Sequence, residues 1–317
     1  MKYFLLFTLT LLLTGAIHAQ SDKVAREKYS WTLGYKPDEL ITFYTPKPDM
    51  DLKLHVFYPE GHKRSNETPC IVFYFGGGWS GGSPDQFYGI SKYLASRGMV
   101  AISAQYRTKK QKAIPRDCVE DGREAIRYVR EHATEIGVDP ERIAAGGGSA
   151  GGHVAAAVGM CPQIDVHPNS KVSSIPDALV LFNPVYHNGP EGYGHSRVTD
   201  YWREISPYHN IREGLPPTIV FFGSDDHCIK LPLIQAFQTD MEKAGNECVT
   251  HIYDKEKHGF FHISKGGRKI FEDVMNKVDG FLVEHKFLSG ESEVEAWTAK
   301  AIEHYKAERG AKQKSKK

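Results

Sequence analysis

The stretch from Arg142 to Gly159, RIAAGGGSAGGHVAAAVG, constrains the fold of this 317-residue chain more than any other stretch does. Six glycines surround one serine, Ser149, although glycine weakens helices and strands alike. An apolar run precedes the cluster and an Ala/Val-rich run follows it, which indicates a strand that turns sharply into a helix. Gly147 and Gly151 leave the space that such a turn needs, so the turn would raise the Ser149 hydroxyl above the edge of a sheet.

Strand and helix patterns alternate on both sides of this turn. Continuous apolar runs predict buried strands at 70–79, 99–107, 177–185 and 217–226. Helical periodicity predicts helices between these strands and after them. They lie at 83–98, in the segment that stops at Gly137, at 231–245 and at 268–288. An alternating run at 52–60 predicts a half-exposed antiparallel strand, and 249–260 predicts a last strand and loop. We therefore expect an α/β fold in which helices cover both faces of a mostly parallel sheet.

The chain divides into three segments by composition. Residues 1–19 contain Lys2, an apolar run and small residues before a cleavage point after Ala19, which is typical of a signal peptide and predicts a secreted or periplasmic protein. An uncleaved anchor is the alternative, but the apolar run is shorter than the ~20 residues that cross a bilayer. Residues 20–288 form one α/β domain. Residues 289–317 turn polar, and we expect a short helix and a frayed basic tail.

The charge balance and the cysteines exclude several classes of partner. With 40 basic and 39 acidic residues the formal net charge is +1, which provides no overall field for nucleic acid or an anionic membrane. The five cysteines form no C-x-x-C pair, so neither a zinc site nor a thioredoxin-type motif is indicated. We expect no metal and no cofactor. Export permits a disulfide, but the odd number leaves at least one thiol unpaired within the chain.

The turn around Ser149 fits the pattern G-x-S-x-G, which points to a nucleophilic serine. A serine hydroxyl attacks only when a base takes its proton, and an acid must orient that base. His258, in KHGFF after the last predicted strand, is the candidate base. Asp225 and Asp226 both follow the penultimate strand, and spacing alone does not choose between them. His153, in the helix behind the serine, is expected to pack or to support the site.

Acyl transfer also needs hydrogen-bond donors for the oxyanion that forms in the tetrahedral intermediate. The run FGGGW at 75–79 supplies bare backbone amides directly after a buried strand. We expect the N–H groups of Gly77 and Gly78, with the N–H of Ala150 at the start of the helix, to form this oxyanion hole.

These motifs together resemble the α/β-hydrolase fold, in the esterase and lipase branch related to hormone-sensitive lipase and to bacterial feruloyl- and acetyl-esterase-like families. The resemblance extends from about residue 40 to 286. Its carriers are FGGGWSGGS, AISAQYR, VEDGREAIRYVREHATEIGVDPERIAAGGGSAGGH, PPTIVFFGSDD and KHGFF. It implies that 20–288 is a catalytic domain with Ser149, His258 and an aspartate as its triad. In such families the acid lies three residues after the glycine that ends the penultimate strand, which selects Asp226 over Asp225.

Two positions depart from the family pattern. Phe75 stands where relatives have the histidine that braces the oxyanion loop, so we expect the same backbone donors with a different support. Gly148 stands where lipase relatives often have aspartate, which favours the carbohydrate-esterase-like neighbours.

The length and composition of two segments suggest the kind of substrate. Only about twenty residues separate the cleavage point from the first strand, too few for a large helical cap, so we expect little or no cap domain and an open site. The insert at 183–210 is rich in Tyr, His, Asn and Trp, and forms either a wall of the site or a surface loop with its own small core. The chain is therefore predicted to be a secreted serine carboxylesterase that removes acetyl or feruloyl groups from carbohydrate. An exopeptidase of the same fold and a non-catalytic binding module are the alternatives.

Overall fold

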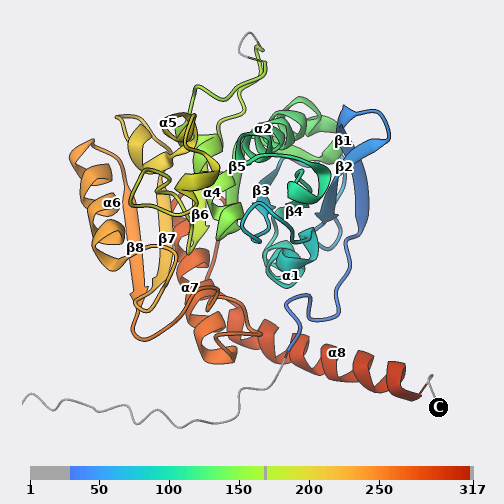
Figure 1. The fold of residues 1–317 in the computed structure, drawn as a ribbon. Helices are drawn as coiled ribbons and strands as arrows, with labels where there is room; N and C mark the ends of the chain where they lie inside the picture. The colour runs from blue at the N-terminus through green and yellow to red at the C-terminus, as the bar shows by residue number, and fades with distance from the viewer. Residues whose placement is uncertain (1–28, 168–169, 315–317) are drawn as a thin grey trace, which may run out of the picture.

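One eight-stranded sheet forms the centre of the computed structural model, which describes residues 29–167 and 170–314 (Figure 1). Its strands lie in the order β1-β2-β4-β3-β5-β6-β7-β8. They span Glu39–Lys47 (β1), Met50–Phe57 (β2), Thr68–Tyr74 (β3), Val100–Ala104 (β4), Val138–Gly148 (β5), Ala178–Phe182 (β6), Thr218–Gly223 (β7) and Cys248–Tyr253 (β8). β2 pairs antiparallel with β1 on one side and with β4 on the other. The other neighbouring strands, in the order β4-β3-β5-β6-β7-β8, pair parallel. The predicted mostly parallel sheet is confirmed.

Helices cover both faces of this sheet (Figure 1). They span Tyr88–Ser96 (α1), Pro115–Glu131 (α2), Ala133–Ile136 (α3), Ala150–Met160 (α4), Trp202–Ile205 (α5), Leu231–Lys243 (α6), Arg268–Glu284 (α7) and Val294–Lys314 (α8). Alternate strand residues point to opposite faces, so β3 contributes Val72 to one core and Phe73 to the other. The first core also contains buried residues of α2, α4 and α6, and the second contains those of α1, α7 and α8.

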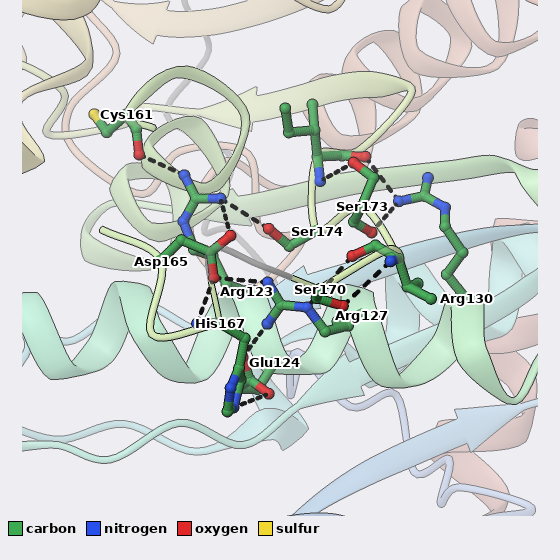
Figure 2. A network of polar contacts seen from close by, with 12 residues as sticks. Arg123, Glu124, Arg127, Arg130, Cys161, Asp165, His167, Ser170, Ser173 and Ser174 are labelled. Atoms are coloured by element: carbon green, nitrogen blue, oxygen red, sulfur yellow. Dashed lines mark hydrogen bonds and ion pairs between the residues drawn. The ribbon is translucent and has the colours of Figure 1, made fainter. Parts of the chain in front are cut away.

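Three arginines of α2 hold the connection between α4 and β6 (Figure 2). Arg123, Arg127 and Arg130 are spaced so that all three lie on one side of the helix. Arg123 donates to the carbonyl oxygen of Cys161, at the end of α4, and Arg127 Nη2 donates to Asp165 Oδ1 at 2.7 Å. Arg130 Nη1 donates to two carbonyl oxygens of the connection at 2.6 and 2.9 Å. These contacts fix the far end of the helix that begins directly after Ser149.

Several element boundaries differ from the predictions. None of the strands predicted from the sequence covers β1, where Phe43 is the one buried residue and the apolar signal is correspondingly weak. The helix expected to run to Gly137 breaks at His132, which ends α2 and precedes α3. β5 begins at Val138 and includes the segment VDPER, for which the sequence predicts a turn. The short helix expected after residue 288 is α8, which is 21 residues long.

The predicted signal peptide at 1–19 and the end of the basic tail lie outside the described residues. Within the described residues, none of the helices combines the length and the apolar content needed to span a membrane. All five cysteines lie in the described part of the chain and are free thiols.

The turn at Ser149 leads to a test of stability with a matched control. A Cβ atom at Gly151 would lie 2.0 Å from the carbonyl oxygen of Tyr74 and 2.4 Å from that of Phe75. Because backbone cannot move aside cheaply, Gly151→Ala should lower the free energy of unfolding by about 3 kcal/mol or more. Gly280→Ala in α7 meets no atom within 4 Å and should raise it by about 0.5–1 kcal/mol. Urea denaturation of both variants measures the difference, and equal midpoints would contradict the tight turn.

Candidate active site

Ser149 lies at the tight turn between β5 and α4. Its backbone has φ 57° and ψ −120°, a left-handed conformation that is strained for a residue with a side chain. The Ser149 N–H donates to the carbonyl oxygen of Phe182 at 3.0 Å, which ties the turn to the end of β6. A Cβ at Gly147 would lie 2.5 Å from the backbone of Gly151, so these two glycines have the spatial role that the sequence predicted.

His258 lies between Ser149 and Asp226 and contacts both. Its Nε2 is 2.8 Å from Ser149 Oγ, and its Nδ1 is 2.8 Å from Asp226 Oδ2. The Asp226 side chain is 1% exposed, and its Oδ1 accepts a hydrogen bond from the Cys228 N–H at 2.7 Å. Asp225 is exposed to solvent. The structure thus brings together Ser149, His258 and Asp226. In this arrangement the imidazole can take a proton from the Ser149 hydroxyl, and the Asp226 carboxylate contacts the other nitrogen of the ring.

Two of the residues predicted to form the oxyanion hole line the same cavity, and the third follows Ser149 directly. Gly77 and Gly78 line it together with Ser149, and both have positive φ angles, 141° and 60°. Within the described residues their N–H groups donate to no protein acceptor. Ala150 is the first residue of α4, so its N–H has no partner inside the helix. Three backbone donors are therefore available beside the serine.

Phe75 supports the oxyanion loop by stacking. Its ring lies on that of Tyr106, with centroids 4.1 Å apart and planes at 13°, and the Tyr106 hydroxyl donates to the Phe75 carbonyl oxygen at 2.5 Å. Burial raises the pKa of Tyr106 well above its usual value, so this donor keeps its proton. Arg197 adds a second support, because its Nη1 donates to the Gly78 carbonyl oxygen at 2.8 Å. These contacts are the different support that the Phe75 departure predicted.

His153 joins the oxyanion loop to the helix behind the serine. Its Nδ1 accepts a hydrogen bond from Trp79 Nε1 at 3.2 Å, and its Nε2 donates to the carbonyl oxygen of Ile205 at 2.8 Å. Burial lowers the pKa of His153 to about 4, so the ring is neutral at neutral pH. His153 therefore packs and supports the site, as expected.

Asn183 lines the cavity beside His258, and no role was predicted for it from the sequence. It is fully buried at the end of β6, with φ 35°. Its Oδ1 accepts a hydrogen bond from the Gly259 N–H at 3.0 Å, and its Nδ2 lies 3.3 Å from His258 Nε2. The available signal was an Asn-Pro pair directly after a buried strand, because asparagine tolerates left-handed backbone better than most residues do.

The cavity above Ser149 has a volume of about 350 Å³. Trp31, Tyr193 and Phe261 provide its aromatic surface. The 183–210 insert contributes Asn183 and Tyr193 to this cavity. The rest of the insert forms an aromatic cluster of its own, with the Trp202 ring 4.6 Å from the ring of His209. One part of the insert thus forms a wall of the cavity, and another part forms a small core of its own.

Asp226, His227 and Cys228 offer three possible metal ligands within 4.8 Å of one another. Both carboxylate oxygens of Asp226 already accept hydrogen bonds, one from His258 and one from the backbone. Burial raises the pKa of the Cys228 thiol to about 11, so the thiol is protonated at neutral pH. These three residues are therefore poor ligands for a cation, and Asp226 instead orients His258.

The fold and the strained serine turn define a hydrolase of the α/β-hydrolase class. Residues 54–177 match the family model described as BD-FAE. A thermophilic esterase from Thermogutta terrifontis with bound propionate superposes with a TM-score of 0.76 at 39% identity, covering 82% of this chain and 97% of that one. Esterase 2 of that organism, phosphorylated by paraoxon, gives 0.75 at 40%, covering 80% and 96%. An acetylxylan esterase from Xylanibacter ruminicola is 28% identical over 204 residues, 60% of this chain and 41% of the relative.

The chain belongs to the serine esterases of the α/β-hydrolase fold, of the type related to hormone-sensitive lipase. It spans 30 to 53% of the length of the first curated relatives that it matches.

Asn183 provides a test of how His258 is held. Asn183→Ala removes the acceptor of the Gly259 N–H and should lower kcat roughly 5- to 10-fold, the effect of about one lost hydrogen bond. Asn183→Asp places a second carboxylate beside His258 Nε2, which stabilises the protonated imidazole. The acid limb of the pH–rate profile should then move to higher pH. Asn210→Ala, which removes an amide that donates to two carbonyl oxygens outside the cavity, is the control. An unmoved profile for Asn183→Asp would contradict the contact.

Proposed function

We propose that the protein hydrolyses short-chain carboxylic esters through a covalent acyl-enzyme. The observation that carries this proposal is the continuous contact from Ser149 Oγ through His258 to Asp226, beside a cavity that Gly77 and Gly78 line. The family supports the same reaction, because its solved relative is an esterase whose phosphorylation by paraoxon is characteristic of a serine hydrolase.

Acylation begins when Ser149 Oγ attacks the ester carbonyl carbon and His258 Nε2 takes the hydroxyl proton. The carbonyl oxygen becomes an oxyanion, which the N–H groups of Gly77, Gly78 and Ala150 stabilise. His258 then gives its proton to the departing alcohol oxygen. Asp226 holds the protonated ring in place through Nδ1, and its second oxygen stays fixed by the backbone.

Deacylation repeats the same steps with water. His258 takes a proton from a water molecule that enters after the alcohol leaves, and the hydroxide attacks the acyl carbon. The second oxyanion occupies the same hole. Collapse of this intermediate breaks the bond to Ser149 Oγ, which recovers its proton from His258. The chemistry of these steps is complete with residues of this chain and water.

For the substrate, we propose an acetyl or feruloyl ester of a carbohydrate. The size of the cavity, about 350 Å³, supports a small acyl group with one ring rather than a long acyl chain. One relative is an acetylxylan esterase, and the Thermogutta terrifontis esterase binds propionate. The aromatic and polar lining of the cavity, with Trp31, Tyr193 and Gln86, suits a ring with hydroxyl groups.

For the location, we propose export from the cytoplasm, followed by removal of the signal peptide without a stable membrane anchor. The support for this proposal is the sequence pattern of residues 1–19.

The esterase proposal is tested by the hydrolysis of p-nitrophenyl acetate, butyrate and laurate and of acetylated xylan. The wild type should cleave the short esters and release acetate from xylan. Ser149→Ala should lose activity by about 10⁴-fold or more, because the nucleophile is absent. Ser96→Ala, which changes a serine on α1 outside the cavity, should keep full activity. If the wild type cleaves none of these substrates, or if Ser149→Ala cleaves them as fast as the wild type does, the proposal fails.

Covalent trapping identifies the nucleophile independently of the natural substrate. Paraoxon should inactivate the wild type with transfer of one diethylphosphoryl group, since Ser149 Oγ attacks phosphorus and p-nitrophenolate leaves. Peptide mapping by mass spectrometry should place this group on Ser149. The same treatment of Ser149→Ala should add no group, and a modification at any other serine would assign the nucleophile elsewhere.

A further inference from the structure

Trp31 lies on the wall of the cavity that contains Ser149 and His258, although it precedes the whole central sheet in the chain. The residue is 37% exposed and lines the cavity, so part of its surface is open to a ligand. Its ring lies 5.8 Å from the ring of His262, and the His262 ring in turn lies 3.9 Å from that of Phe261, with the planes tilted by 35°. The three side chains form one continuous aromatic wall beside the nucleophile.

The segment 29–35 that carries Trp31 is held tightly against α1. Leu33 is fully buried and has φ 48°. The Trp31 carbonyl oxygen approaches α1 so closely that a Cβ atom at Gly89 would lie 2.5 Å from it. The Gly34 N–H donates to Thr32 Oγ1 at 3.1 Å, which closes a local turn. The position of Trp31 is therefore fixed by packing.

The C-terminal helix α8 provides the other half of this support. The ring of Tyr35 stacks on that of His304, with centroids 4.9 Å apart and planes at 10°. The ring of Tyr29 meets that of Tyr305 edge to face at 6.2 Å. Figure 1 shows the start of the described chain, in dark blue, passing beside α8, in red. Contacts on both sides of Trp31 thus come from the last helix of the chain.

The helix α8 is itself anchored to the body of the domain. The ring of Trp297 lies 5.4 Å from that of Tyr93 in α1, and Val294 and Ala301 are buried in the core that α1 and α7 share. The Tyr93 hydroxyl donates to Asp279 of α7 at 2.6 Å. This helix is therefore a rigid part of the structure, and it can fix the segment that it contacts.

We propose that Trp31 determines specificity by stacking on a ring of the ester substrate, and that α8 acts on specificity through Tyr35 by holding the 29–35 segment in place. The proposal rests on the esterase function proposed above, because it concerns what that site binds. Aromatic side chains attract flat and ring-shaped groups through their faces, and a partly exposed tryptophan beside a nucleophile offers such a face. Trp31 is 37% exposed and Tyr35 does not line the cavity, so Trp31 contacts the substrate and Tyr35 is a positioning residue.

The first experiment compares ring-bearing esters with a ring-free ester. Methyl ferulate and phenyl acetate carry a ring in the acyl and in the alcohol part, and ethyl acetate carries none. In Trp31→Ala, kcat/KM should fall roughly 3- to 10-fold for at least one ring-bearing ester, mainly through KM, and stay within about 2-fold for ethyl acetate. Trp31→Phe, which keeps an aromatic face, should recover most of the loss.

The second experiment tests the coupling to α8. Selectivity here is the ratio of kcat/KM for a ring-bearing ester to kcat/KM for ethyl acetate. Tyr35→Ala should reduce this ratio by a smaller factor than Trp31→Ala does, with unchanged activity on ethyl acetate. In the Trp31→Ala background, Tyr35→Ala should have no further effect on selectivity, because its effect passes through Trp31. Lys300→Ala, an exposed position on α8, should leave selectivity unchanged.

The outcomes separate this proposal from the esterase proposal. If the wild type hydrolyses no ester, the proposed function fails. If the wild type is active but Trp31→Ala keeps the wild-type ratio of ring-bearing to small esters, the stacking role is wrong. If Tyr35→Ala and Trp31→Ala change selectivity additively, α8 does not act through Trp31. Thermal unfolding of each variant identifies a loss of activity that comes from unfolding, since unfolding lowers activity on all esters equally.

Discussion

The close approach of α4 to the end of β3 is the constraint on which the rest of the site depends. At Gly151 the helix backbone lies against the carbonyl groups of Tyr74 and Phe75, and a methyl group would not fit between them. This approach forces Ser149 into its left-handed conformation. It also places the first N–H of α4 next to the loop that follows β3. One packing contact thus determines where both Ser149 and the backbone N–H groups beside it lie.

The loops around Ser149 depend on hydrogen bonds to polar side chains from other segments. His153 and Arg197 hold Trp79 and Gly78 of the oxyanion loop, and Asn183 holds the peptide that follows His258. Each contact joins segments that are distant in the chain. Loops have few apolar contacts of their own, so such polar contacts supply the order that catalysis needs.

The sequence predicted the parts of this site that depend on local pattern. The G-x-S-x-G turn, the alternation of strands and helices and the positions of Ser149 and His258 follow from patterns along the chain, whereas the family resemblance selected Asp226 over Asp225. The structure brings these three residues into contact. Asn183 and Trp31 were not predicted. Asn183 acts through a contact with the loop after β8, and Trp31 is placed by a helix about 270 residues away in the chain. No local periodicity reports such contacts.

Two buried neutral histidines contribute a pH dependence to the stability of the fold. Burial lowers the pKa of His153 to about 4 and that of His262 to about 3, whereas an unfolded chain binds these protons near pH 6.5. Between these values the unfolded state takes up protons that the native state excludes, so the free energy of unfolding decreases as the pH falls below about 6.5. The same burial that lets His153 accept the hydrogen bond from Trp79 therefore makes the contribution of this histidine to stability decrease in acid.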